Sequence, residues 1–167
     1  LQDRGGRDVY FGNRYGQAFA AHQAAGILVD RAGDDTYWSM TAASQAGSWD
    51  QSVAMLIDHS GNDTYRCDGL GLGGAAMQSI AIAIDRAGDD AYHAAGSDTL
   101  GRSGGNGYHF DADGVLSFSY FRDDGGADRY PANRGDANGR TLTDDGSVAG
   151  ELSGSTRLFG VFVDQDY

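Results

Sequence analysis

Five copies of one eight-residue motif place pairs of aspartates at a fixed spacing along this 167-residue chain. The motif reads D-x-x-G-x-D-x-Y, and residues 58–65 (DHSGNDTY) are one copy. Its first aspartates are Asp3, Asp30, Asp58, Asp85 and Asp123, and a shortened copy begins at Asp164. Carboxylates are the ligands that hard cations prefer, and Ca²⁺ takes about 6–8 oxygens. The repeated aspartate pairs therefore indicate cation binding as the first chemistry to consider.

The spacing of the motif predicts the fold. Successive first aspartates are 27, 28, 27, 38 and 41 residues apart, a period typical of repeat proteins. Short apolar runs at 27–29, 55–57, 82–84 and 161–163 precede the motifs, and their length and Gly/Asp boundaries predict strands. We therefore expect an all-β fold: a right-handed parallel β-helix, or β-solenoid, with three strands in each coil of about 27 residues and the motif as a turn. The chain is expected to be one domain, 1–167, with regular coils over 3–95 and coils carrying two loop insertions over 96–167.

Stacked coils would place equivalent aspartates about 4.8 Å apart, close enough for carboxylates to repel one another. Bound Ca²⁺ would compensate this charge. Alternatively, each aspartate caps its own turn by accepting backbone N–H bonds, or Arg4, Arg31 and Arg86 neutralise the columns. The candidate metal ligands are Asp30, Asp34, Asp35, Asp58, Asn62, Asp63, Asp85, Asp89, Asp90, Asp123 and Asp128.

The segment 60–68 resembles the calcium-binding nonapeptide repeat of RTX proteins, G-G-x-G-x-D-x-hydrophobic-x. Gly61, Asn62, Asp63 and Tyr65 match its second half. The resemblance implies a parallel β-roll or β-helix, secreted or on the cell surface of bacteria, that binds Ca²⁺ in its turns. The sequence departs from the family because one copy occurs in each repeat rather than copies in tandem, and an aspartate replaces the leading glycine.

Two further columns of identical residues accompany the aspartates. The motif tyrosines are expected to stack in the core or along an edge; alternatively Tyr37, Tyr65 and Tyr92, together with Trp38, form an aromatic strip that binds sugar rings. Gln23, Gln51 and Gln78 each precede a first aspartate by seven residues. Such a column predicts side-chain amide bonds along the stack.

Composition excludes some classes of function. The net charge of −12 argues against nucleic-acid binding, because phosphates would be repelled. No apolar run is long enough to span a membrane. We expect carbohydrate or cell-surface ligands as partners, and self-association through the ends of the solenoid or an apolar face. The middle residues of the apolar runs, Leu28, Leu56, Phe121 and Phe162, alternate out of phase with their neighbours, so either a second layer covers them or they form an interface.

These observations favour a secreted, non-catalytic, Ca²⁺-binding module with a structural, adhesive or carbohydrate- or surface-binding role. The alternative is a polysaccharide lyase or glycoside hydrolase, which needs two carboxyl groups about 5–9.5 Å apart. Its candidate catalytic residues are Asp111, Asp113, Asp123 and Asp124. Ice binding is a third alternative, for which only Thr36 and Thr64 align.

Overall fold

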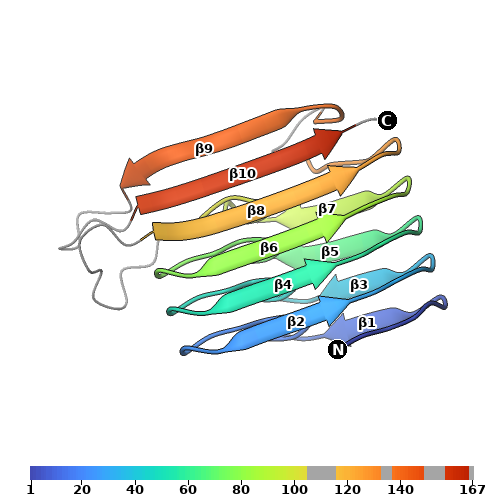
Figure 1. The fold of residues 1–167 in the computed structure, drawn as a ribbon, viewed down its shortest axis with the longest axis horizontal. Coiled ribbons are helices and arrows are strands. Elements are labelled where there is room, and N and C mark those ends of the chain that lie inside the picture. Colours follow the sequence, from blue (N-terminus) through green and yellow to red (C-terminus); the bar gives the residue numbers. More distant parts are fainter. Residues whose placement is uncertain (105–115, 133–136, 149–156, 166–167) are drawn as a thin grey trace.

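The computed structural model describes residues 1–104, 116–132, 137–148 and 157–165, which form ten strands in two sheets (Figure 1). The four-stranded sheet consists of β1 (Val9–Gly12), β3 (Thr36–Ser39), β5 (Thr64–Asp68) and β7 (Ala91–Ala95). The six-stranded sheet consists, in spatial order, of β2 (Ala25–Val29), β4 (Val53–Ile57), β6 (Ile80–Asp85), β8 (Leu116–Asp124), β10 (Arg157–Gln165) and β9 (Thr141–Val148).

The motif links the two sheets, as its turn residues predict. Strand β4 ends directly before Asp58, and β5 begins directly after Asp63. Successive repeats are in register, so that Tyr37 pairs with Tyr65 and Asp85 with Asp123. The predictions that the apolar runs form strands and that the motif turns the chain are therefore confirmed.

The predicted fold class, a right-handed parallel β-helix with three strands per coil, is wrong. Each of the first four repeats contributes one strand to each of two sheets, and the Ala/Gln/Gly segment between these strands pairs with its neighbours only through isolated bridges such as Ser44 to Gly71. Residues such as Gln45, Ala46 and Leu72 have positive φ in this segment, which interrupts a strand. The larger sheet is also mixed, because β9 pairs antiparallel with β10.

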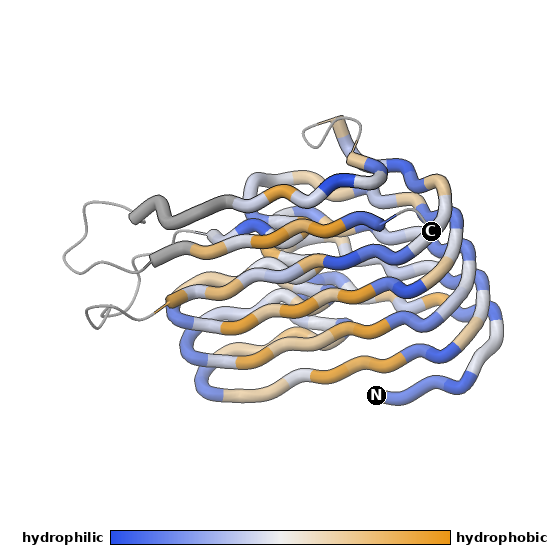
Figure 2. The backbone as a smooth tube through the Cα atoms, turned by 45° about the horizontal axis from the view of Figure 1, so that its top comes forward, coloured by the Kyte–Doolittle hydropathy of each residue, from blue (hydrophilic) through white to orange (hydrophobic). Residues whose placement is uncertain are grey.

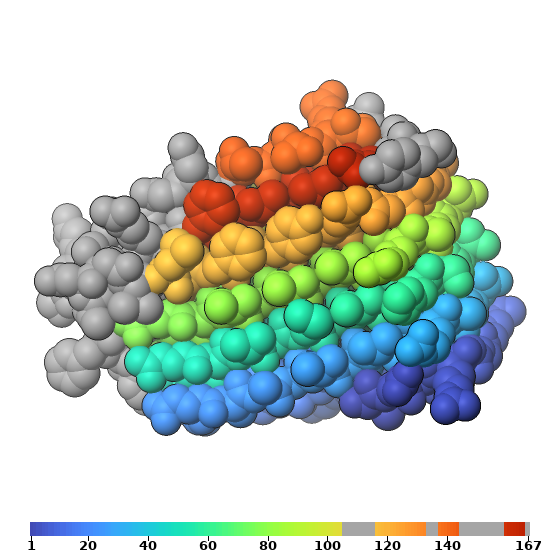
Figure 3. All heavy atoms as spheres, viewed as in Figure 1, coloured from blue at the N-terminus to red at the C-terminus, as the bar shows by residue number. Residues whose placement is uncertain are grey.

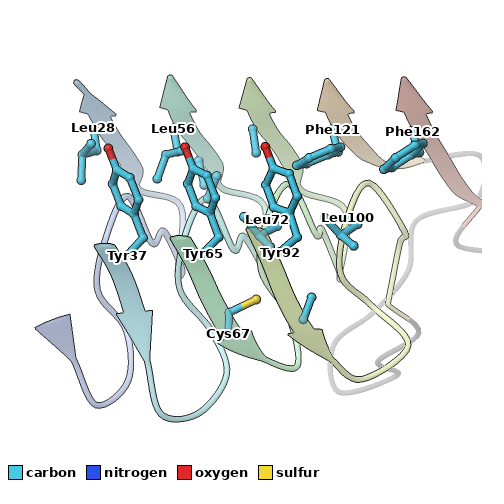
Figure 4. Close-up of a cluster of buried hydrophobic side chains, with 14 of the residues drawn as sticks. Leu28, Tyr37, Leu56, Tyr65, Cys67, Leu72, Tyr92, Leu100, Phe121 and Phe162 are labelled. Atoms are coloured by element: carbon cyan, nitrogen blue, oxygen red, sulfur yellow. The ribbon is translucent and has the colours of Figure 1, made fainter. Parts of the chain in front are cut away.

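The core lies between the two sheets, where the motif tyrosines meet the middle residues of the apolar runs (Figure 4). Leu28, Leu56, Phe121 and Phe162 are each at most 2% exposed. Of the two alternatives, the covering second layer is confirmed, because the tyrosines of the four-stranded sheet pack against these residues, and they form no exposed interface. Successive strand residues point to opposite sides, so the inward direction of each first aspartate also turns the residue two positions earlier inward.

The flanking apolar residues instead point outward from the six-stranded sheet, the face viewed in Figure 3. Ile27, Val53 and Ile80 are 54%, 40% and 42% exposed. In Figure 2 the same strands are largely hydrophobic, and the turns that follow them are hydrophilic.

The motif glycine is required by the close approach of neighbouring turns. A Cβ atom added to Gly61 would lie 1.6 Å from the carbonyl oxygen of Gly33, and one added to Gly88 would lie 1.6 Å from that of Gly61. No side chain fits at this distance, which explains why the glycine recurs in every copy of the motif.

Candidate metal-binding site

A row of nine buried aspartates runs along the inside of the motif turns. They form four overlapping triads, in each of which carboxylate oxygens of all three residues lie within 4.8 Å of one another. The triads are Asp30–Asp35–Asp58, Asp58–Asp63–Asp85, Asp85–Asp90–Asp123 and Asp123–Asp128–Asp164. None of the nine side chains is more than 6% exposed.

The first aspartate of each motif binds a tyrosine of the preceding repeat. The hydroxyl of Tyr37 donates to Oδ2 of Asp58 at 2.6 Å, and that of Tyr65 donates to Oδ2 of Asp85 at 2.6 Å. In Asp30, Asp58 and Asp85 the other carboxylate oxygen accepts from a backbone N–H of its own turn, as Asp58 Oδ1 does from Ser60 at 3.1 Å, whereas Oδ1 of Asp123 is buried without a partner in the described part of the chain. The tyrosine column thus orients the aspartate column as well as filling the core.

The second aspartates Asp35, Asp63 and Asp90 each hold adjacent turns together through one oxygen. Oδ1 of Asp63 accepts from the backbone N–H of Asp35 at 2.6 Å, and Oδ1 of Asp90 accepts from that of Asp63 at 2.6 Å. This column of second aspartates ends at Asp128, whose N–H donates to Asn138 Oδ1 at 2.8 Å instead of to a further carboxylate. The second oxygens, Oδ2 of Asp35, Asp63 and Asp90, are buried and have no hydrogen-bond partner in the described part of the chain.

The electrostatics of the row require positive charge. Two carboxylates 4.8 Å apart repel by about 3 kcal/mol even at an effective dielectric of about 20. Desolvation, together with the charges of Asp58 and Asp85, raises the pKa of Asp63 to about 8. Desolvation and the charge of Asp85 likewise raise the pKa of Asp123 to about 9. Each triad must therefore take up either protons or a cation.

The triads fit a hard divalent cation. Ca²⁺–oxygen distances are about 2.3–2.6 Å, so two oxygens on opposite sides of one ion are about 5 Å apart, as in the triads. The triads contain only carboxylates, a ligand type that suits Ca²⁺, Mg²⁺ or Mn²⁺ rather than softer metals. The unpartnered oxygens of Asp35, Asp63 and Asp90 supply acceptors that no protein donor satisfies. Four divalent ions would bring eight positive charges to the nine carboxylates.

The structure divides the predicted metal ligands into two groups. Eight of them, Asp30, Asp35, Asp58, Asp63, Asp85, Asp90, Asp123 and Asp128, belong to the triads. The other three, Asp34, Asn62 and Asp89, are exposed and cap turns instead: Asp34 Oδ1 accepts from the N–H of Asn62 at 2.9 Å, and Asn62 Oδ1 from that of Asp89 at 2.8 Å. The predicted cap of an aspartate on its own turn is found within the triads, at Asp30, Asp58 and Asp85, and cation binding at the same residues stays a prediction.

Asp164 was missing from the predicted ligands. It completes the fourth triad, and its Oδ2 accepts from the Tyr130 hydroxyl at 2.5 Å. Its place one repeat after Asp123, behind the apolar run 161–163, is the sequence signal that identifies it. By contrast Arg31 and Arg86 are exposed, and no arginine of the described chain binds an aspartate in the first three triads.

The predicted aromatic ligand-binding residues separate in the same way. Tyr37, Tyr65 and Tyr92 are at most 2% exposed and their rings stack, with centroids 4.7 Å apart between the first two and 5.0 Å between the next two (Figure 4). These rings offer no face to a ligand. Trp38 points the other way and is 38% exposed.

Of the predicted catalytic aspartates the structure describes Asp123 and Asp124, and it does not bring these two together. Asp123 points into the core and is buried, whereas the adjacent Asp124 is directed outward and binds Arg122 Nε at 2.7 Å. These two carboxylates therefore lie on opposite faces of β8. Asp111 and Asp113 lie outside the described residues.

Among the described residues there is no helix with the length and apolar character needed to cross a membrane. Comparisons of the chain with protein-family models, with curated proteins and with solved structures found no match, so none of them identifies the RTX-like repeat.

Proposed function

We propose that the chain is a non-catalytic module that binds a row of Ca²⁺ ions among its buried aspartates. Its role would be structural, adhesive or surface-binding, outside the cell. The observation that carries the proposal is the set of four buried carboxylate triads, three of which contain a second-aspartate oxygen (Oδ2 of Asp35, Asp63 or Asp90) that has no hydrogen-bond partner among the described residues.

Calcium would act as part of the core. An ion in each triad satisfies the oxygens that lack donors and offsets the repulsion between repeats, so the folded chain binds it and the unfolded chain does not. Ligand that binds only the folded state stabilises it by about 2.7 kcal/mol at a concentration of 100 times Kd. Extracellular calcium is abundant enough to fill even the weaker sites of extracellular modules, with Kd of about 0.1–1 mM, which is why the proposal places the chain outside the cell. The likeness that we propose to the RTX repeat is this binding of Ca²⁺ by aspartates.

Thermal unfolding with EDTA and with millimolar Ca²⁺ tests the proposal. We expect Ca²⁺ to raise the Tm of the wild-type chain by at least about 5 °C, because several sites contribute. Asp63→Asn keeps the shape and the bond to the N–H of Asp35 but removes a charged ligand, and should reduce this increase. Asp89→Asn is the matched control, since Asp89 is exposed and outside the triads.

A Tm that is the same in EDTA and in Ca²⁺, together with purified protein free of metal, would refute the proposal. In that case protons would neutralise the carboxylates. An equal loss of the calcium effect in Asp63→Asn and Asp89→Asn would place the ions outside the triads.

A further inference from the structure

A groove of about 650 Å³ crosses the outer side of the four-stranded sheet. Its lining residues differ in type from those of the aspartate row. We call it the outer groove and define it by the side chains of Trp38, Met40, Arg66, His93, Arg129 and Pro131. These residues come from β3 and the residue after it, from β5 and β7, and from the segment that follows Asp128.

Strand register brings the groove residues into one row. Trp38 pairs with Arg66 across β3 and β5, and Arg66 pairs with His93 across β5 and β7. Each follows directly after a buried motif tyrosine, so the alternation of side chains directs it away from the core. The repeat that places tyrosines inside therefore also places this row outside, where its residue types differ from one repeat to the next.

The tryptophan end of the groove combines an aromatic ring with a cation that lies over it. The Trp38 ring contacts Phe11 edge-on, with centroids 5.2 Å apart, and Cζ of Arg66 lies 5.5 Å from the centroid of the Trp38 ring. The part of the Trp38 ring that stays exposed can contact the apolar face of a sugar ring, and the N–H groups of the guanidinium above it remain available to a charged substituent.

The charge of the groove is opposite to that of the chain. The chain has a net charge of −12, yet Arg66, Arg129 and His93 line the groove against one acid, Asp68. Within the described residues the guanidinium groups of Arg66 and Arg129 have no hydrogen bond or ion pair to another protein group. A free guanidinium binds a carboxylate through two parallel hydrogen bonds.

We propose that the outer groove binds an acidic polysaccharide, with a sugar ring on Trp38 and uronic-acid carboxylates on Arg66 and Arg129. The inference names the ligand class of the surface-binding role proposed above and rests on that proposed function. A neutral glycan would leave both guanidinium groups without partners. Nucleic acid would meet an acidic chain whose overall charge repels it.

Calorimetric titration with a galacturonic-acid hexasaccharide tests this inference, with a neutral glucose hexasaccharide as the ligand control. Both titrations use wild-type protein in a fixed excess of Ca²⁺. We expect binding of the acidic hexasaccharide that is at least tenfold tighter than that of the neutral one. Arg66→Gln and Trp38→Ala should each weaken it at least tenfold. The matched control Arg86→Gln, which removes an exposed arginine outside the groove, should leave it unchanged.

The melting curve of each variant in Ca²⁺ separates this inference from the proposed function. Absence of binding to the acidic hexasaccharide by a chain that still shows the calcium-dependent Tm would overturn the groove proposal alone. Equal weakening by Arg66→Gln and Arg86→Gln would also overturn it, because the interaction would then be unspecific attraction to arginine. Loss of the calcium effect in wild-type protein would instead refute the proposed function.

Discussion

Two columns of polar side chains run through the repeats, and they satisfy their hydrogen-bonding groups in opposite ways. Gln23, Gln51 and Gln78 bond to one another: Nε2 of Gln23 donates to Oε1 of Gln51 at 3.2 Å, and Nε2 of Gln51 donates to Oε1 of Gln78 at 3.0 Å. This confirms the amide bonds predicted for the column. An amide has both a donor and an acceptor, so a stack of amides satisfies itself.

The aspartate column cannot do this. An ionised carboxylate only accepts, so stacked aspartates need donors from elsewhere. Tyrosine hydroxyls and backbone N–H groups supply most of them, and Oδ2 of Asp35, Asp63 and Asp90 stays without a donor among the described residues. The comparison teaches that a buried acidic column, unlike an amide column, stabilises the fold only with an added cation or proton.

Removing a shared ligand should have the largest effect. Asp58 belongs to two triads and Asp35 to one. At a Ca²⁺ concentration of 100 times Kd, Asp58→Asn should lose about 5 kcal/mol of calcium-dependent stability and Asp35→Asn about half of that. Urea unfolding of both variants with Ca²⁺ and with EDTA measures the difference. Equal losses would show that the triads do not share ligands.

Raising the pH should weaken the metal-free protein. The pKa of Asp63 is about 8 in the folded chain and near 3.8 when unfolded, so between these values the folded state holds more protons than the unfolded state. Stability in EDTA should therefore fall by about 2 kcal/mol or more from pH 5 to pH 8. In saturating Ca²⁺ the fall should be smaller, because the cation takes the place of the protons. Urea unfolding across this pH range measures the change. A stability in EDTA that rose from pH 5 to pH 8 would contradict the expectation.

Removing a donor should have an intermediate effect. Tyr65→Phe keeps the stacked ring but removes the hydroxyl that donates to Asp85, which should cost about 1.5–3 kcal/mol. Tyr15→Phe is the control, because Tyr15 is 45% exposed. The free energy of unfolding of both variants measures this effect. A loss in Tyr65→Phe no greater than in Tyr15→Phe would mean that the hydroxyl does not stabilise the aspartate.

The smallest effect should come from the amide column. Gln51→Leu breaks two exposed amide bonds and should cost less than about 1 kcal/mol, equally with Ca²⁺ and with EDTA. A loss that depended on Ca²⁺ would remove the contrast between the two columns. The same unfolding curves provide this test.

Much of this arrangement follows from sequence. The motif, its turns, the strands before it and the stacked tyrosines and glutamines are visible as equal spacings. The number of strands per repeat could not be predicted, because the left-handed φ values at residues such as Gln45 and Leu72 depend on the packing of the Ala/Gln/Gly segment. The inward side of each apolar run was visible but overlooked: Leu28 lies two residues before Asp30, so both share one face of the chain. Which aspartates turn inward could not be decided, since Asp89 and Asp90 are neighbours of the same type with opposite exposure.

The number of ions bound tests the central claim most directly. Native mass spectrometry of the chain, after removal of metal and addition of Ca²⁺, counts them. We predict four Ca²⁺ per chain, one for each triad, and two for Asp58→Asn, which belongs to two of the triads. A wild-type chain that binds no calcium under conditions in which it is folded would contradict the account, because the nine buried carboxylates would then hold protons alone.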